Sequence, residues 1–197
     1  MKYYQQQLNP FSLNYLKDLW GEIQVCPYFA INNLNRDFVN TKGFSVVFRR
    51  EGLLLVEQRF PFLKPYLKVA LQPDCNAFYL NPLLLTEGSR VEPHIDRSLR
   101  SYCKTIDPPA LVSVLYVRIP EGMEGGELVL RTPKQQVGLI KPQTNTMIYF
   151  QGDLTHAIKA VKTPGFRLSL VCEQYNLSDV ELREIPEFKL ESRARQS

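Results

Sequence analysis

The chain has 197 residues, of which 44% are hydrophobic and 22% charged, and its formal net charge is +4. This composition is that of an ordinary globular domain, and it excludes a disordered or fibrous chain. Its longest apolar runs are far too short to cross a bilayer, and residues 1–7 lack the apolar core of a signal peptide. We therefore expect a cytoplasmic protein without a membrane segment, and the mild basic excess gives little support for nucleic acid as a partner.

Residues 1–75 mix helical and extended patterns. Asn9 followed by Pro10 is typical of a helix start, with Asn9 as the cap and Pro10 as the first helical residue. Farther along, Glu51-Gly52 predicts a turn between two extended runs. The predicted elements are a helix over 10–20, strands over 44–48 and 53–56, and a second helix over 63–71.

From residue 76 to about residue 175 the pattern is that of short strands separated by turns. Residues 111–117 form a run of β-branched and aromatic side chains with high strand propensity. Gly122 and Gly125-Gly126 then predict a hairpin loop leading to a partner strand. The remaining predicted strands are 77–80, 127–130, 137–140, 146–150, 157–161 and 166–171. This spacing favours a β-sandwich or a barrel without choosing between them.

The only two histidines of the sequence occur in patterns that suit a metal site. His94 and Asp96 are two residues apart, and on a strand such residues point to the same face. His156 follows sixty residues after Asp96, in another strand or strand end. Two imidazoles and one carboxylate on one face of an octahedron leave three positions open, which suits non-haem Fe(II). Taken alone, the His94–Asp96 pair also fits a core histidine beside a turn residue.

A second pattern begins eleven residues after His156. Arg167 and Ser169 alternate with apolar residues, so they share one face of a predicted strand. A buried arginine needs an anionic partner, and its planar fork binds a carboxylate through two hydrogen bonds. The two side chains therefore predict a site for a small dicarboxylate, unless Arg167 lies on the surface.

The combination His94-Ile95-Asp96, His156 and Arg167-Leu168-Ser169 resembles the Fe(II)/2-oxoglutarate-dependent dioxygenase superfamily. The segment Gly125-Gly126-Glu127-Leu128 is similar to a stretch of its prolyl 4-hydroxylase-like branch. The resemblance covers about residues 76–176, half of the chain. One departure is that collagen-type prolyl 4-hydroxylases usually carry a lysine where Arg167 stands; arginine serves the same charge pairing.

The resemblance implies a mainly β fold with flanking helices, built on a double-stranded β-helix (jelly roll). It implies one domain over 1–197, with supporting elements in 1–75, the jelly roll in 76–176 and a tail over 186–197. The implied cofactors are Fe(II), 2-oxoglutarate as co-substrate and O2, with ascorbate as a candidate addition. Arg167, Ser169 and, by position, Tyr116 would contact the far carboxylate of 2-oxoglutarate, and Tyr79 is a candidate for the opposite wall of the cofactor site.

The substrate is less well defined by the sequence. The resemblance implies hydroxylation of a C–H bond, in a prolyl or other residue of a protein or peptide, or in a free amino acid or small metabolite. A non-catalytic 2-oxoglutarate-binding protein is a third alternative. The loop over 97–109 follows Asp96 and carries Arg97, Arg100 and Lys104. It is either a lid for an acidic or phosphorylated substrate or an ordinary solvated loop. The oligomeric state stays open.

Overall fold

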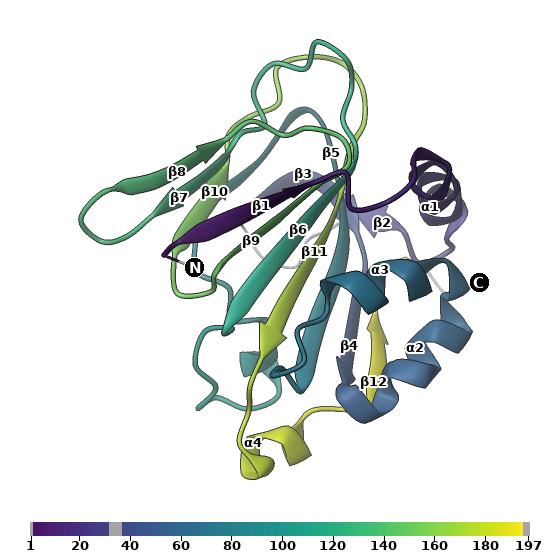
Figure 1. The fold of residues 1–197 in the computed structure, drawn as a ribbon, viewed down its shortest axis with the longest axis vertical. Helices are drawn as coiled ribbons and strands as arrows, with labels where there is room; N and C mark the ends of the chain where they lie inside the picture. Colours follow the sequence, from purple (N-terminus) through teal and green to yellow (C-terminus); the bar gives the residue numbers. More distant parts are fainter. Residues whose placement is uncertain (1, 32–36, 195–197) are drawn as a thin grey trace.

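The computed structural model describes residues 2–31 and 37–194. A strongly curved antiparallel sheet forms its centre, with helices on one side (Figure 1). Its strands are β1 (Tyr4–Leu8), β2 (Ala30–Ile31), β3 (Phe38–Gly43), β4 (Ser45–Arg49), β5 (Ala77–His94), β6 (Leu111–Arg118), β7 (Leu128–Arg131), β8 (Gln136–Ile140), β9 (Thr146–Gln151), β10 (Thr155–Ile158), β11 (Arg167–Tyr175) and β12 (Phe188–Glu191). The fold is thus mainly β, and its nearly closed sheet is that of a jelly roll.

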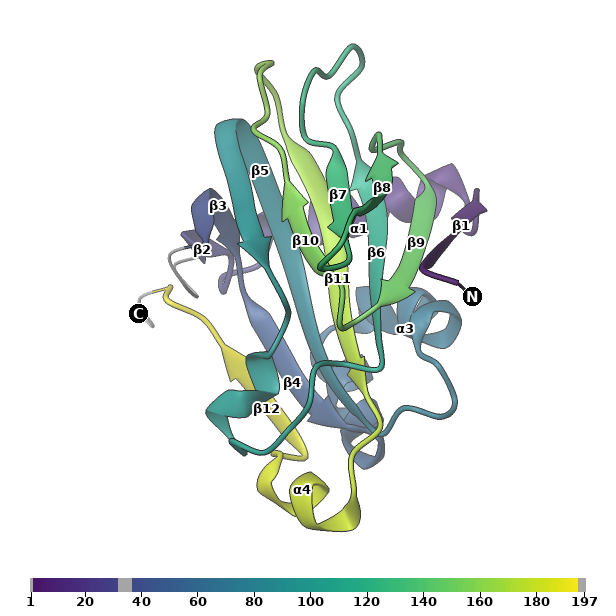
Figure 2. The ribbon, with the colours of Figure 1, turned by 90° about the vertical axis from the view of Figure 1, so that its left-hand side faces the viewer.

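The long strand β5 joins the two layers of this sheet (Figure 2). Its first half pairs with β11 on one side, while on the other side β4 pairs with its start and β3 with residues 83–91. Its last residues pair with β10, which continues the sheet to β7 and β8. On the far side of β11 the sheet runs through β6 and β9 to β1. Since β5 belongs to both layers, its C-terminal end lies where the layers open.

Strand β6 shows why the strands are apolar on both faces. Successive side chains of a strand point to opposite sides of the sheet. Val114 and Tyr116 pack into the core between the two layers, while Leu115 and Val117 pack into a second core under the helices. A strand covered on both faces carries a nearly continuous apolar run rather than an alternating one, as residues 111–117 do apart from Ser113.

The helices cover the outer face of the larger layer. Leu16 and Leu19 of the first helix and Leu67 of the third belong to the same buried cluster as Leu115. The α-helices are α1 (Leu13–Val25), α2 (Leu53–Arg59), α3 (Lys64–Ala70) and α4 (Asp179–Glu184), and the 3-10 turns are η1 (Arg50–Gly52), η2 (Pro61–Leu63) and η3 (Ser98–Ser101). Among the described residues, no helix is long and apolar enough to span a membrane.

Three predictions for the N-terminal part are wrong. The run from residue 53 to 56 is not a strand but the start of α2; three of its four residues are leucines, which favour helix over strand. Gly52 does not turn a hairpin there but ends η1 directly before α2, at a place where a Cβ would overlap the Glu187 carbonyl oxygen. The first helix is capped by the Ser12 side chain, which accepts a hydrogen bond from the Tyr15 N–H, and not by Asn9.

Part of the predicted tail over 186–197 is a strand. Residues 188–191 form β12, which pairs with β4 from Phe188↔Phe48 to Glu191↔Ser45. The main-chain groups of β4 would otherwise form an open edge of the sheet. Residues 195–197 of the predicted tail lie outside the described residues.

Candidate active site

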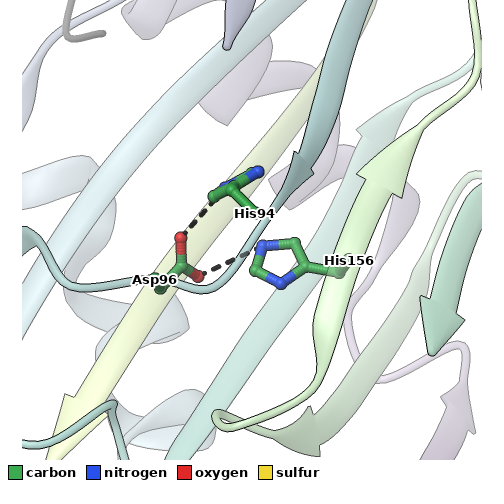
Figure 3. A group of neighbouring side chains, drawn as sticks. All are labelled: His94, Asp96 and His156. Carbon is green, nitrogen blue, oxygen red and sulfur yellow. Dashed lines mark ion pairs between the residues drawn. The ribbon is translucent and has the colours of Figure 1, made fainter. Parts of the chain in front are cut away.

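Three side chains meet where the two layers open. His94 is the last residue of β5, Asp96 follows two residues later, and His156 lies on β10 directly opposite His94. Nε2 of His94 is 3.2 Å from Oδ1 of Asp96, and Nε2 of His156 is 3.3 Å from Oδ2. Figure 3 shows the carboxylate beside the two rings, with one oxygen facing each of them. The pairing of β5 with β10 brings together two histidines that are sixty-two positions apart.

Both imidazoles are oriented by the backbone. Nδ1 of His94 lies 2.8 Å from the Glu92 carbonyl, and Nδ1 of His156 lies 3.2 Å from the Leu154 carbonyl. A carbonyl only accepts, so each Nδ1 carries a hydrogen, and in the neutral ring that metal binding requires each Nε2 presents a lone pair. This arrangement fixes the tautomer and the ring direction in metal-binding histidines. The two Nε2 atoms and the Asp96 carboxylate therefore face one point.

The three residues fit a divalent metal ion. Their ligand atoms lie within 4.8 Å of one another, and two ligands about 2.1 Å from a metal in adjacent positions are separated by about 3 Å. Nε2 of His94 and Oδ2 of Asp96 are buried and hydrogen-bond to no residue that the structure describes. Burial would raise the pKa of Asp96, but His156 and His94 hold that pKa below its usual range. The carboxylate thus stays ionised, as metal binding requires.

A cavity of about 330 Å³ extends from these ligands into the space between the layers. Its size is at the lower end of the range of small-molecule sites, roughly 300–1,000 Å³. Arg167 and Ser169 of β11 and Tyr116 of β6 line it, and Ser169 and Tyr116 are neighbours in the register of the two strands. The structure therefore brings the predicted metal ligands and three of the predicted cofactor residues to one cavity.

The Arg167 guanidinium is almost completely buried, with 1% of the residue exposed. Its Nη1 donates to the Gly126 carbonyl at 2.6 Å, and it lies 5.2 Å from the centre of the Tyr116 ring. Burial lowers its pKa, and Tyr116 and Glu127 offset part of that effect. Nε of Arg167 and the hydroxyls of Tyr116 and Ser169 have no hydrogen-bond partner within residues 2–31 and 37–194. These three groups can donate hydrogen bonds into the cavity beside a buried cation, an arrangement that suits a carboxylate ligand.

The comparison with protein families agrees with this geometry. Residues 79–172 match the model of the 2OG-Fe(II) oxygenase superfamily. The chain belongs to this superfamily. The matched segment of the oxygenase runs from β5 to β11 and contains both ligand strands. A search of the curated proteins finds no match.

Solved structures with the same fold include prolyl hydroxylases at low identity. The oxygenase is similar to a Pseudomonas putida prolyl-4-hydroxylase (15% identity, 89% of this chain and 93% of that chain covered, TM-score 0.58). It is also similar to the viral collagen prolyl hydroxylase of Paramecium Bursaria Chlorella virus-1 (19%, 86% and 94%, 0.53). A third is a Trichoplax adhaerens prolyl hydroxylase in complex with a hypoxia inducible factor peptide (12%, 91% and 86%, 0.56). At these identities the likeness shows the fold alone.

Gly126 has a role in the oxygenase that the sequence patterns do not reveal. It has a positive φ of 71°, and a Cβ there would lie 2.8 Å from Met123 and 3.1 Å from Nη1 of Arg167. Only glycine tolerates both the backbone conformation and the approach of the guanidinium. The Gly-Gly-Glu-Leu stretch thus positions the carbonyl that orients Arg167. The stretch itself was visible in the sequence, but its contact with a residue forty-one positions away was not.

Tyr79 and the loop over 97–109 lie at the other end of the cavity. Tyr79 pairs with Glu173 in the register of β5 and β11, whereas Leu85 pairs with Arg167. Tyr79 lines the cavity and its hydroxyl accepts a hydrogen bond from Ser45, so it lies away from the Arg167 end. From the loop, Arg97, Ser98 and Ser101 line the cavity, Arg100 donates to the Ile106 carbonyl at 2.6 Å, and Lys104 is exposed.

Proposed function

We propose that this oxygenase hydroxylates a C–H bond of a prolyl or other residue in a protein or peptide. In the overall reaction, the substrate C–H, O2 and 2-oxoglutarate give the hydroxylated product, succinate and CO2. One observation carries the proposal: three residues that can bind a metal ion and a buried arginine that can bind a carboxylate line the same cavity. Iron, when bound, supplies the oxidising chemistry.

The side chains of the chain have distinct tasks in this proposal. His94, Asp96 and His156 would hold Fe(II) on one face and leave its other positions for ligands. Arg167 would bind the far carboxylate of 2-oxoglutarate through its fork, supported by the hydroxyls of Ser169 and Tyr116. Apolar neighbours of the cavity, such as Val114 and Leu128, exclude water and strengthen this charge pairing.

The cavity also has a mouth through which a substrate side chain can enter. It reaches exposed residues at Arg97 and Ser101, so the reacting C–H bond can approach from the η3 side while 2-oxoglutarate occupies the Arg167 end. The peptide seen with the Trichoplax adhaerens structure supports a peptidyl substrate. A free amino acid or small metabolite is the second candidate, because the cavity is small. Ascorbate use and a cytoplasmic location stay predictions.

The proposal is tested with purified protein loaded with Fe(II) without oxygen. After oxygen is admitted, we expect slow formation of succinate from 2-oxoglutarate even without substrate. Asp96→Ala should weaken Mn(II) binding by about 100-fold or more and abolish succinate formation. The matched control Asp153→Ala removes an exposed carboxylate near His156 and should change neither. A wild-type protein that binds no Mn(II) or forms no succinate would refute the proposal.

A further inference from the structure

The cavity has charged residues of opposite sign at its two ends. Every second residue of β11 from Arg167 to Glu173 lines it, by way of Ser169 and Val171. At about 3.3 Å per residue, the Cα atoms of Arg167 and Glu173 are roughly 20 Å apart. In the proposed reaction 2-oxoglutarate binds at the Arg167 end, whereas the carboxyl group of Glu173 at the other end has no role.

Glu173 is buried without a charged partner. Only 4% of the residue is exposed. Its Oε1 accepts from the Ser98 hydroxyl at 2.5 Å, and its Oε2 accepts from the Ser98 N–H at 3.2 Å and from the Tyr175 hydroxyl. All three donors are neutral, and no lysine or arginine of the described residues forms an ion pair with it. A buried carboxylate is costly unless a cation compensates it.

The pKa of Glu173 also reflects its burial without a cation nearby. Burial and the neighbouring Asp96 raise the pKa of Glu173 to about 8, although hydrogen bonds from Ser98 and Tyr175 lower it. A cation entering this end of the cavity would stabilise the ionised form.

Most of the remaining charged residues that line the cavity are acidic. Asp37 and Glu191 also line the cavity; Glu191 accepts from the Tyr102 hydroxyl and lies 3.7 Å from Nζ of Lys189. Arg97, the one described cation that lines this end, is exposed. This distribution disfavours the acidic or phosphorylated substrate that the loop over 97–109 suggested.

We propose that Glu173 selects the substrate by forming an ion pair with an ammonium or guanidinium group next to the oxidised C–H bond. The inference rests on the proposed function, because it assumes that the substrate enters the cavity beside the metal ligands. The Ser98 and Tyr175 hydroxyls then hold the carboxylate in place, and Tyr79 lies beside it on β5.

A purely structural role for Glu173 makes a different prediction. Its bonds to Ser98 attach η3 to β11, and a glutamine of the same size retains an oxygen acceptor for one of these donors. If Glu173 only attached the loop, Glu173→Gln would affect charged and neutral probes alike. If Glu173 pairs with a cation, the substitution removes the preference for the charged probe.

The test measures binding by calorimetry, without oxygen, to protein loaded with Mn(II) and 2-oxoglutarate. The probes are N-acetyl-lysine amide and N-acetyl-arginine amide, each against its uncharged counterpart, the norleucine and citrulline amides. Free lysine and arginine form a second arm, which separates a free amino acid from a peptide residue. We expect at least one cationic probe to bind wild-type protein about 30-fold or more tightly than its counterpart.

The variants decide the origin of this preference. In Glu173→Gln it should fall to less than about threefold, and Glu173→Asp, which keeps the charge, should retain part of it. Glu184→Gln, an exposed carboxylate on α4, is the control and should leave the preference unchanged. The melting temperature and Mn(II) binding of Glu173→Gln report on its folding, and loss of both would overturn the proposal in favour of a structural role.

Two further results would also overturn it: no cationic preference in the wild type, or a preference that survives in Glu173→Gln. In both cases normal Mn(II) and 2-oxoglutarate binding would leave the proposed function standing. Failure of the wild type to bind Mn(II) or 2-oxoglutarate would instead refute the proposed function itself.

Discussion

Replacing Arg167 by methionine separates the function of this residue from its effect on folding. Arg167 is 1% exposed, and its guanidinium donates a hydrogen bond to the Gly126 carbonyl. The substitution leaves the Gly126 carbonyl without this donor, which costs about 1–3 kcal/mol. It also removes a buried, uncompensated charge, which is worth several kcal/mol in the opposite direction. We therefore expect the free energy of unfolding of Arg167→Met to fall by less than about 2 kcal/mol.

The effect on 2-oxoglutarate should be much larger. Two charge-assisted hydrogen bonds to its carboxylate contribute together about 3–5 kcal/mol, which corresponds to a loss of affinity of about 100- to 4,000-fold. At a concentration of 100 Kd, the ligand stabilises wild-type protein by about 2.7 kcal/mol. For a protein of this length that raises Tm by about 5–11 °C. At the same concentration, Arg167→Met should gain about 1 °C or less.

The assay is thermal unfolding with Mn(II) in place of Fe(II), with and without 2-oxoglutarate, together with calorimetry of both ligands. Arg131→Met, an exposed arginine at the end of β7, is the matched control and should keep the full shift in Tm. Mn(II) affinity should stay nearly intact in both variants. A loss of 2-oxoglutarate affinity smaller than tenfold in Arg167→Met, or an equal loss of Mn(II) affinity, would refute the reasoning.

Two further substitutions examine the surroundings of Arg167. Gly126→Ala places a Cβ 3.1 Å from the Arg167 Nη1 at a φ of 71° and should weaken 2-oxoglutarate binding about tenfold or more by displacing the guanidinium. Gly122 has a similar φ of 68° with open space around it. The control Gly122→Ala should therefore lower stability by about 1 kcal/mol and leave the affinity for 2-oxoglutarate, measured by calorimetry, unchanged. Equal effects of the two variants on this affinity would contradict the steric argument. Tyr116→Phe removes a buried hydroxyl that has no partner among the described residues. Its Tm without ligand should not fall, and its Kd for 2-oxoglutarate should rise about three- to tenfold; an unchanged Kd would show that the hydroxyl does not reach the ligand.

Strand prediction succeeded where local sequence carries the decisive information. The run over 111–117 is β-branched and aromatic, so it forms β6 within one residue of the predicted end. The prediction failed for residues 53–56, because the periodicity of so short an apolar run does not distinguish a buried strand from a helix, although its three leucines favour the helix. It also missed that 188–191 forms β12, since pairing with β4 is a long-range contact that no local pattern expresses.

The sequence by itself determined the chemistry available to this protein. The spacing of His94 and Asp96, the second histidine and the alternation of Arg167 with Ser169 define ligand types and strand faces, because side-chain direction along a strand repeats every two residues. Only the tertiary structure decided which of these groups meet. The pairing of β5 with β10 places His156 opposite His94, and Gly126 reaches Arg167 across forty-one residues. It likewise decided that Glu173 is buried beside the cavity, where the Ser98 N–H and hydroxyl of η3 donate hydrogen bonds to its carboxyl group.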